Sequence, residues 1–173
     1  MVSETPPASP SMLVPMEPGK ATLRVEQSGS GEVCSRVLAA LPTWFGIPES
    51  VADYVASADT HPTVIASADG DDVGLLTLVT HTRYAAEVYV MGVLPDHHRH
   101  GIGRAMLERA EEWLSEREIE YLQVKTLSSR HPDPGYAKTR AFYLACGFRP
   151  LEEFPDLWSP DQPALQMVKA LGR

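Results

Sequence analysis

The chain has 173 residues, of which 43% are hydrophobic and 22% are charged. These proportions are typical of a soluble globular domain with a substantial core. The formal net charge of −8 argues against general binding to nucleic acid or acidic membranes. Cys34 and Cys146 have neither metal-binding nor redox spacing, so a reducing, cytoplasmic location is expected.

The first twenty residues are rich in proline, with serine, threonine and glutamate between the prolines. They lack both the basic start of a signal peptide and an apolar run long enough to cross a membrane. This composition predicts a disordered leader over residues 1–20. The folded domain is then expected to occupy residues 21–173.

From residue 21 onward, strand patterns alternate with helix patterns. Asp69-Gly70 marks a hairpin turn, so the strands on either side of it should pair antiparallel. The expected strands are 21–25, 62–67, 73–80, 85–94, 120–127, 148–151 and 164–169, and the expected helices are 32–40, 49–58, one that starts at 102, and 136–146.

An aromatic loop separates the first two expected helices and is bracketed by Pro42 and Pro48. Its Trp44 and Phe45 have two interpretations. They could line a substrate pocket, or they could pack between the two short helices.

The central stretch of the sequence is a strand, a loop and a glycine-rich helix start. The strand pattern over residues 88–93 stops at Pro95, and Gly101-Ile102-Gly103 then opens an amphipathic helix. The first N–H groups of a helix lack intrahelical partners and lie at the positive end of its dipole. Glycine lets an anion approach them closely, so this stretch predicts a phosphate site that Arg99 and Arg104 supplement.

Two common phosphate motifs do not fit this chain. Met106 stands where the dinucleotide fingerprint needs its third glycine. The sole Gly-Lys pair, Gly19-Lys20, is followed by Ala21 rather than by the serine or threonine of a Walker A loop.

A third pattern fits better. Val93-x-Pro95, then Arg99, then Gly101-x-Gly103 resembles the acetyl-CoA pyrophosphate loop of the GNAT superfamily of N-acyltransferases. His98 occupies the place of the superfamily's usual Gln or Arg.

Two more segments resemble the same superfamily. Residues 141–148, AFYLACGF, resemble its C-terminal F/L-Y-x-x-x-G-F segment, and residues 86–95 resemble the strand that carries the pantetheine arm. Tyr136 stands where many relatives have an asparagine that contacts the cofactor. The resemblance covers residues 21–171 and implies an α+β fold: a central mixed, mostly antiparallel sheet of six to seven strands with about four helices.

The resemblance also implies an activity. The expected protein is an N-acetyltransferase that moves an acetyl group from acetyl-CoA to a primary amine by direct attack in a ternary complex. Its partner would be a small-molecule or peptide amine, with no nucleic acid, no membrane and no metal, and it would be a monomer or homodimer. The alternative is a CoA-binding sensor or interaction module of the same fold without turnover.

The resemblance assigns roles to individual residues. Glu87 would be the base and Tyr143 the proton donor to the departing thiolate. Cys146 is a poor nucleophile because its sequence neighbours are apolar. His97, His98 and His100 resemble no closed metal-ligand set. The expected cofactor-binding residues are Met91, Gly92, Val93, His98, Arg99, His100, Gly101, Ile102, Gly103 and Arg104.

Strand geometry adds one further expectation. Side chains alternate between the two faces of a strand. Glu87, Tyr89 and Met91 should therefore share one face, while Val88, Val90 and Gly92 share the other. Arg83 is the nearest cation in sequence that could pair with Glu87 if that residue were structural.

Overall fold

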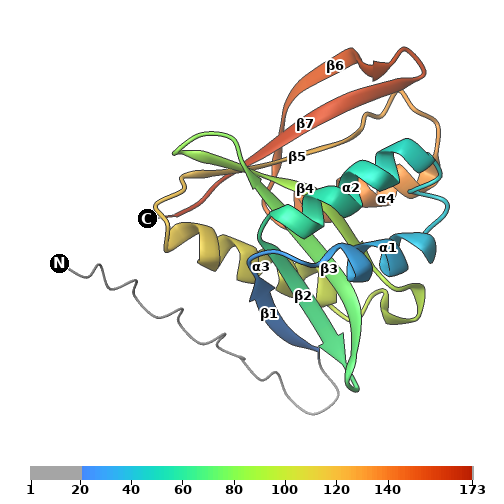
Figure 1. The fold of residues 1–173 in the computed structure, drawn as a ribbon. Helices are drawn as coiled ribbons and strands as arrows, with labels where there is room; N and C mark the ends of the chain where they lie inside the picture. Colours follow the sequence, from blue (N-terminus) through green and yellow to red (C-terminus); the bar gives the residue numbers. More distant parts are fainter. Residues whose placement is uncertain (1–20, 173) are drawn as a thin grey trace.

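The computed structural model describes residues 21–172, and the leader expected over residues 1–20 lies outside them. The described chain forms one seven-stranded sheet with helices on both faces (Figure 1). The strands are β1 (Thr22–Glu26), β2 (Thr63–Ala68), β3 (Asp71–Thr80), β4 (Ala85–Val93), β5 (Tyr121–Leu127), β6 (Arg149–Ser159) and β7 (Gln162–Ala170). The helices are α1 (Gly31–Ala39), α2 (Pro48–Thr60), α3 (Ile102–Ser115), α4 (Pro134–Ala145) and the short 3₁₀ helix η1 (Pro95–His97).

The strand order is β1-β2-β3-β4-β5-β7-β6. All neighbours pair antiparallel except β4 and β5, which are parallel and are connected through α3. A parallel pair needs such a crossover, because a hairpin can only join antiparallel strands. The mixed, mostly antiparallel sheet with four α-helices confirms the expected fold class.

The β4–β5 pairing is short. Residues 85–88 of β4 pair with residues 121–124 of β5, and the pairing ends there. Beyond that point β4 remains paired with β3, and β5 remains paired with β7. We call the opening between residues 89–93 and residues 125–127 the wedge. Its apex lies where the last pair, Val88 and Val124, is formed.

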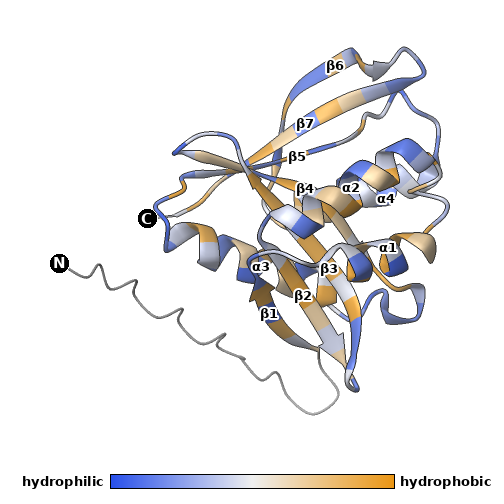
Figure 2. Cartoon of the chain, in the orientation of Figure 1, coloured by the Kyte–Doolittle hydropathy of each residue, from blue (hydrophilic) through white to orange (hydrophobic). Residues whose placement is uncertain are grey.

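The core has one layer on each face of the sheet. Side chains of α3 and α4 pack on one face with Val88, while side chains of α1 and α2 pack on the other with Val90. Hydrophobic and hydrophilic residues are mixed along the helices (Figure 2), and the buried apolar residues of α1 and α3 belong to the two core layers. In α3 the predicted apolar stripe is confirmed, because Ile102, Met106, Ala110, Trp113 and Leu114 are all buried. No helix among residues 21–172 has the length and apolarity needed to span a membrane.

A β-bulge interrupts β4 at Tyr89. Val88 pairs with Leu78 and Val90 pairs with Thr77, so Tyr89 is an extra residue without a counterpart on β3. An inserted residue shifts the strand's alternation by one position. Side chains on the two sides of Tyr89 therefore follow different alternation patterns.

The expected face assignment of β4 is consequently wrong beyond Tyr89. Val88 and Met91 both contact the cluster on the α3 side, whereas Val90 belongs to the cluster on the α1 side. A Cβ built on Gly92 would lie 3.1 Å from atoms of Val37 in α1. Met91 and Glu87 thus lie on opposite faces.

The β6 strand is longer than expected. It runs to Ser159, although residues 148–151 alone showed a strand pattern. Pro150 and Pro155 lie within it, and its register against β7 shifts twice. Proline is tolerated there because β6 is the edge strand, where one side needs no ladder hydrogen bonds.

Candidate active site

The glycine-rich loop connects β4 to α3 through residues 94–101. Arg99 and Gly101 both have positive φ angles, 63° and 79°. Gly101 is the N-cap of α3, and no side chain caps this helix end. A left-handed conformation suits glycine, so the sequence at Gly101 matches its geometry.

The loop presents a run of unused backbone donors. Among the described residues, no acceptor is bonded to the N–H groups of residues 99–104, and the first recorded donor is Ala105, which bonds Gly101 O at 3.0 Å. Consecutive free amides at the start of a helix form a site for an anion. The geometry therefore suits a phosphate or pyrophosphate group.

The two glycines at the start of α3 have different roles. A Cβ on Gly101 would meet nothing within 4 Å, so its requirement is the positive φ angle. A Cβ on Gly103 would lie 3.0 Å from Met91 Cε and 3.3 Å from Phe142 Cζ. Gly103 thus permits close packing of α3 against β4 and α4, in addition to whatever room it gives an anion.

The polar side chains of the loop divide into two groups. His98 and Arg104 are tied to the fold, because His98 Nε2 lies 2.6 Å from Val93 O and Arg104 Nη2 donates to Ala145 O at 3.1 Å. Arg99 and His100 are exposed. Within residues 21–172 neither of these two side chains makes a hydrogen bond to another part of the protein.

At the apex of the wedge lies a buried carboxylate. Glu87 is 6% exposed. Its oxygens accept hydrogen bonds from Lys125 Nζ at 2.9 and 3.0 Å and from Gln123 Nε2 at 3.4 Å, and His81 Nε2 lies 2.6 Å from Oε2. We call these four residues the Glu87 centre. Arg83 is not its partner; its guanidinium stacks on the ring of Tyr84 at 4.4 Å.

The sheet builds the Glu87 centre from three segments. Glu87 pairs in register with Gln123, and Lys125 follows two residues later on the same face of β5. His81 comes from the turn that connects β3 to β4. Sequence reasoning identified Glu87 alone, since no local pattern links it to a lysine 38 positions away.

Aromatic rings cover the same face of the wedge. The rings of Tyr54 and Tyr89 lie 5.5 Å apart, and those of Tyr54 and Phe45 lie 5.8 Å apart. Burial, with smaller effects from Tyr89 and other neighbouring groups that include Glu87, raises the pKa of Tyr54 to about 12. These phenols are therefore neutral near pH 7.

The aromatic loop between α1 and α2 contacts both the glycine-rich loop and α4. Trp44 contacts the ring of His98, with centroids 6.4 Å apart, and its carbonyl accepts a 3.1 Å hydrogen bond from the Tyr136 hydroxyl. Trp44 and Phe45 also pack against the core on the α1 side. The interpretation that Trp44 and Phe45 pack between the first two helices is thus confirmed. The same packing places both rings beside the wedge.

Tyr143 lies in the core on the other face. Its ring contacts Phe142 and Phe148 at centroid distances of 5.3 and 5.4 Å. Burial raises the pKa of its phenol well above the ordinary value. Its hydroxyl makes no recorded hydrogen bond within residues 21–172. Burial also raises the pKa of the Cys146 thiol, which makes that residue a poor nucleophile.

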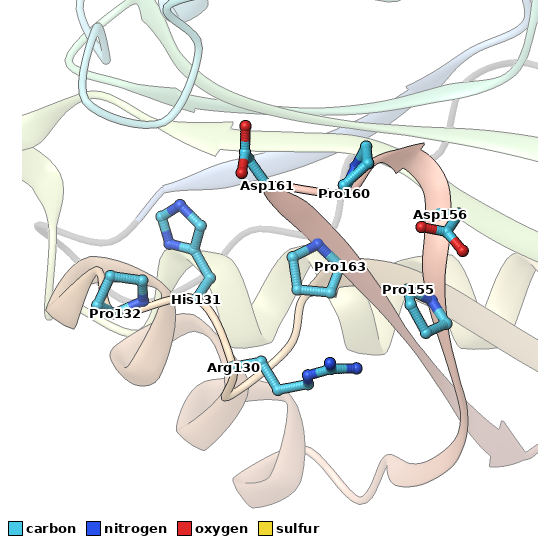
Figure 3. A pocket seen from close by; sticks show the side chains of 8 residues that line it. All are labelled: Arg130, His131, Pro132, Pro155, Asp156, Pro160, Asp161 and Pro163. Carbon is cyan, nitrogen blue, oxygen red and sulfur yellow. The ribbon is translucent and has the colours of Figure 1, made fainter.

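Two cavities open near the site. One, of about 480 Å³, lies between the loop after β5 and the β6–β7 hairpin (Figure 3), and its lining includes Arg130, His131, Asp156 and Asp161. The other, of about 590 Å³, lies between the β2–β3 turn and the start of the glycine-rich loop at Leu94 and His97. Within residues 21–172, no three His, Cys, Asp or Glu side chains are grouped so that they could hold a metal ion.

Comparison with known proteins identifies the fold. The family profile described as acetyltransferase (GNAT) domain matches residues 59–150. No curated protein matches the chain. A GNAT-family acetyltransferase structure from Desulfovibrio desulfuricans has 19% identity and a TM-score of 0.75, covering 88% of this chain and 99% of its own.

Two further structures are similar over most of their length. The ribosomal-protein-S18-alanine N-acetyltransferase of Escherichia coli has 17% identity and a TM-score of 0.68, with coverage of 87% of this chain and 95% of its own. A GNAT family acetyltransferase from Elizabethkingia anophelis, with acetyl-CoA bound, has 14% identity and a TM-score of 0.65, with coverage of 86% and 98%.

Proposed function

Because the chain belongs to the GNAT acetyltransferase family, we propose that it transfers the acetyl group of acetyl-CoA to a primary amine by direct attack in a ternary complex. One observation carries this proposal. The wedge has free backbone amides for a pyrophosphate at its glycine-rich loop and a buried carboxylate at its apex. A thioester held along the wedge would meet an amine near Glu87.

The cofactor would be held mainly by backbone groups. The amides of residues 99–104 would bind the pyrophosphate, with Arg99 and His100 adding charge and hydrogen bonds from the side. Met91, Gly92 and Val93 lie on the part of β4 that is not paired with β5. That free strand edge can hydrogen-bond the amide groups of the pantetheine arm as a neighbouring strand would.

The reaction needs three proton or charge adjustments. The amine must lose a proton before it attacks the thioester, an oxyanion develops on the carbonyl, and CoA leaves as a thiolate. We assign proton removal to the Glu87 centre and donation to the thiolate to Tyr143. The raised pKa of Tyr143 keeps its phenol protonated and available as an acid.

The acceptor would be an amine of a small molecule or a peptide. The cavity between the loop after β5 and the β6–β7 hairpin carries Asp156 and Asp161. Carboxylates there would raise the local concentration of an ammonium-bearing acceptor. Arg130, on the same cavity, is partly neutralised by Glu153 at 3.0 Å.

One observation favours the alternative of a binding protein without turnover. The carboxylate of Glu87 is buried and accepts hydrogen bonds from three side chains, so it is poorly placed to receive a proton from a substrate. The two functions differ in a direct measurement. Purified full-length protein is incubated with acetyl-CoA and a panel of polyamines, amino acids, aminoglycosides and peptides, and CoA thiol release is followed.

The enzyme is supported if at least one amine accelerates thiol release and gains 42 mass units, the mass of an added acetyl group, in mass spectrometry. Calorimetry with acetyl-CoA runs beside this assay. Tight binding of acetyl-CoA without transfer to any amine would favour the sensor, and failure to bind it would contradict both functions.

A further inference from the structure

We propose that His81 is the base that removes the proton from the acceptor's ammonium group, and that Glu87 positions it and balances its charge. This inference rests on the proposed acetyl transfer and deepens it. It concerns a residue that lies outside the sequence motifs, in the turn between β3 and β4.

The first argument is the occupancy of Glu87. Lys125 donates to both carboxylate oxygens, and Oε2 is also bonded by His81 and Gln123. Only 7% of the Glu87 side chain is exposed. Oε1 accepts from Lys125 alone and keeps a second lone pair, but it belongs to a buried carboxylate. A proton taken up there would cancel the charge that Lys125 and His81 are bonded to, which is costly away from water.

The second argument is the placement of His81. Its side chain is 41% exposed, while its Nε2 lies 2.6 Å from Glu87 Oε2. Within residues 21–172 the other ring nitrogen, Nδ1, makes no recorded hydrogen bond. A carboxylate that accepts from Nε2–H fixes the tautomer whose Nδ1 carries the lone pair. The ring is thus anchored on one side and accessible to an amine or a water on the other.

The proton step balances without a further reactant. The Nδ1 lone pair takes one proton from the ammonium group, directly or through one water, and the acceptor becomes a neutral amine. The ring becomes imidazolium, and the negative charge of Glu87 stabilises it, as the buried carboxylate does in a Ser-His-Asp triad. Loss of the Nδ1 proton to solvent restores the starting state. The neutral amine then attacks the thioester carbonyl.

Other charged and titratable groups surround this pair. Lys125 of β5 contacts Glu87 from the sheet side. Besides burial, the negative charges of Glu87 and Asp53 help to raise the pKa of Tyr54 in α2 and of Tyr89 in β4. Burial raises the pKa of both phenols, so they stay neutral near pH 7. Within residues 21–172, the charged side chains in contact with the His81–Glu87 pair at that pH are therefore reduced to Lys125, and Asp53 lies beside the two tyrosines.

The test compares His81→Ala and His81→Gln with the wild-type enzyme on its best amine. Both variants should lose about 10²-fold in kcat, the usual scale for losing a general base, with acetyl-CoA affinity unchanged. Added imidazole should restore part of the rate of His81→Ala, since the site is open to solvent. His81→Gln can keep a hydrogen bond to Glu87 but cannot accept the proton, so it should remain slow.

A matched control is His61→Ala. The His61 ring bonds Ser57 and Thr60 and not Glu87, so this variant should keep the wild-type rate. The pH profile gives a second measurement. In wild type the rate should fall as pH decreases, since imidazolium cannot accept a proton. In His81→Gln this fall should be smaller, because an amide does not take up the proton.

Three results would overturn the inference. A wild-type rate in both His81 variants together with a slow Glu87→Gln would make Glu87 itself the base. Imidazole without effect on a folded His81→Ala, with His81→Gln active, would make the histidine a structural hydrogen-bond donor. A wild-type protein that binds acetyl-CoA yet acetylates no amine would refute the proposed function, and this inference with it.

Discussion

The glycine-rich loop and the Glu87 centre are built in opposite ways. The loop is one contiguous segment whose functional groups are backbone amides, and its side chains are largely exposed. The Glu87 centre combines side chains from a turn and two strands, and its carboxylate is buried. A backbone site needs only the right local conformation, whereas a side-chain site needs the whole sheet.

This difference predicts how each region responds to mutation. Buried charged groups depend on their partners, so removing one of them should affect stability as well as chemistry. Exposed groups around backbone amides contribute little individually. Substitutions in the Glu87 centre should therefore have large effects on turnover, and substitutions of exposed residues in the loop should have smaller effects, mainly on cofactor affinity.

The largest effect is expected for Glu87→Ala. Removing the carboxylate leaves Lys125 and His81 without their shared partner, so turnover should fall about 10²- to 10³-fold. The free energy of unfolding should also decrease by about 2 kcal/mol. Steady-state kinetics and urea denaturation measure the two losses. If calorimetry showed that acetyl-CoA affinity falls by the same factor as turnover, the proposed division of roles between the Glu87 centre and the glycine-rich loop would be wrong.

Tyr143→Phe should have the next largest effect. The hydroxyl makes no recorded hydrogen bond within residues 21–172, so stability should change by less than about 1 kcal/mol. The kcat should fall roughly tenfold or more, because the thiolate loses its proton donor.

The pH profile sharpens this prediction. Burial raises the pKa of Tyr143, so the acid form persists to higher pH than in a free tyrosine. The wild-type rate should therefore not fall as the pH approaches about 10, where free tyrosine ionises. A Tyr143→Phe variant with the wild-type kcat would leave packing as the residue's sole role.

The two glycines of the loop should respond differently to alanine. Gly101→Ala strains a residue with φ of 79° and should weaken acetyl-CoA binding by about five- to tenfold, because the amides lose their alignment. Gly103→Ala pushes on Met91 and Phe142 and should mainly lower the unfolding temperature.

Gly29→Ala is the matched control for backbone strain. Gly29 has a similar φ of 83° and open space around it, but it lies before α1, away from the loop. The Gly29→Ala variant should be less stable than wild type but should bind acetyl-CoA with the same affinity. Calorimetry measures the acetyl-CoA affinity of all three variants, and thermal unfolding measures their stability. If Gly101→Ala bound acetyl-CoA as tightly as wild type, the loop would not be part of the cofactor site.

The smallest effect is expected for Arg99→Asn. Asparagine tolerates the left-handed conformation at this position, so the change removes the charge and leaves the backbone in place. Acetyl-CoA affinity should fall by only about two- to fivefold, the scale of an exposed ion pair. The dependence of affinity on salt should become shallower. A loss above a hundredfold would show that side-chain charge, and not the amides, dominates the loop.

The sequence alone predicted the features that arise from local patterns. The apolar stripe of α3, the glycine-rich start of that helix and the antiparallel hairpin at Asp69-Gly70 follow from spacing along one segment. The family resemblance followed from the same contiguous motifs, and the family profile confirmed it. Periodicity and turn chemistry are properties of neighbouring residues, so they can be read without the fold.

The tertiary structure decided the rest. The bulge at Tyr89 depends on how β4 pairs with β3, and it reversed the expected face of Met91. The partners of Glu87 depend on the parallel β4–β5 pair and on the β3–β4 turn, so nearby Arg83 was a misleading candidate and distant Lys125 was missed. Pairing register and long-range contacts are set by the free energy of the whole sheet, and no short stretch of sequence contains that information.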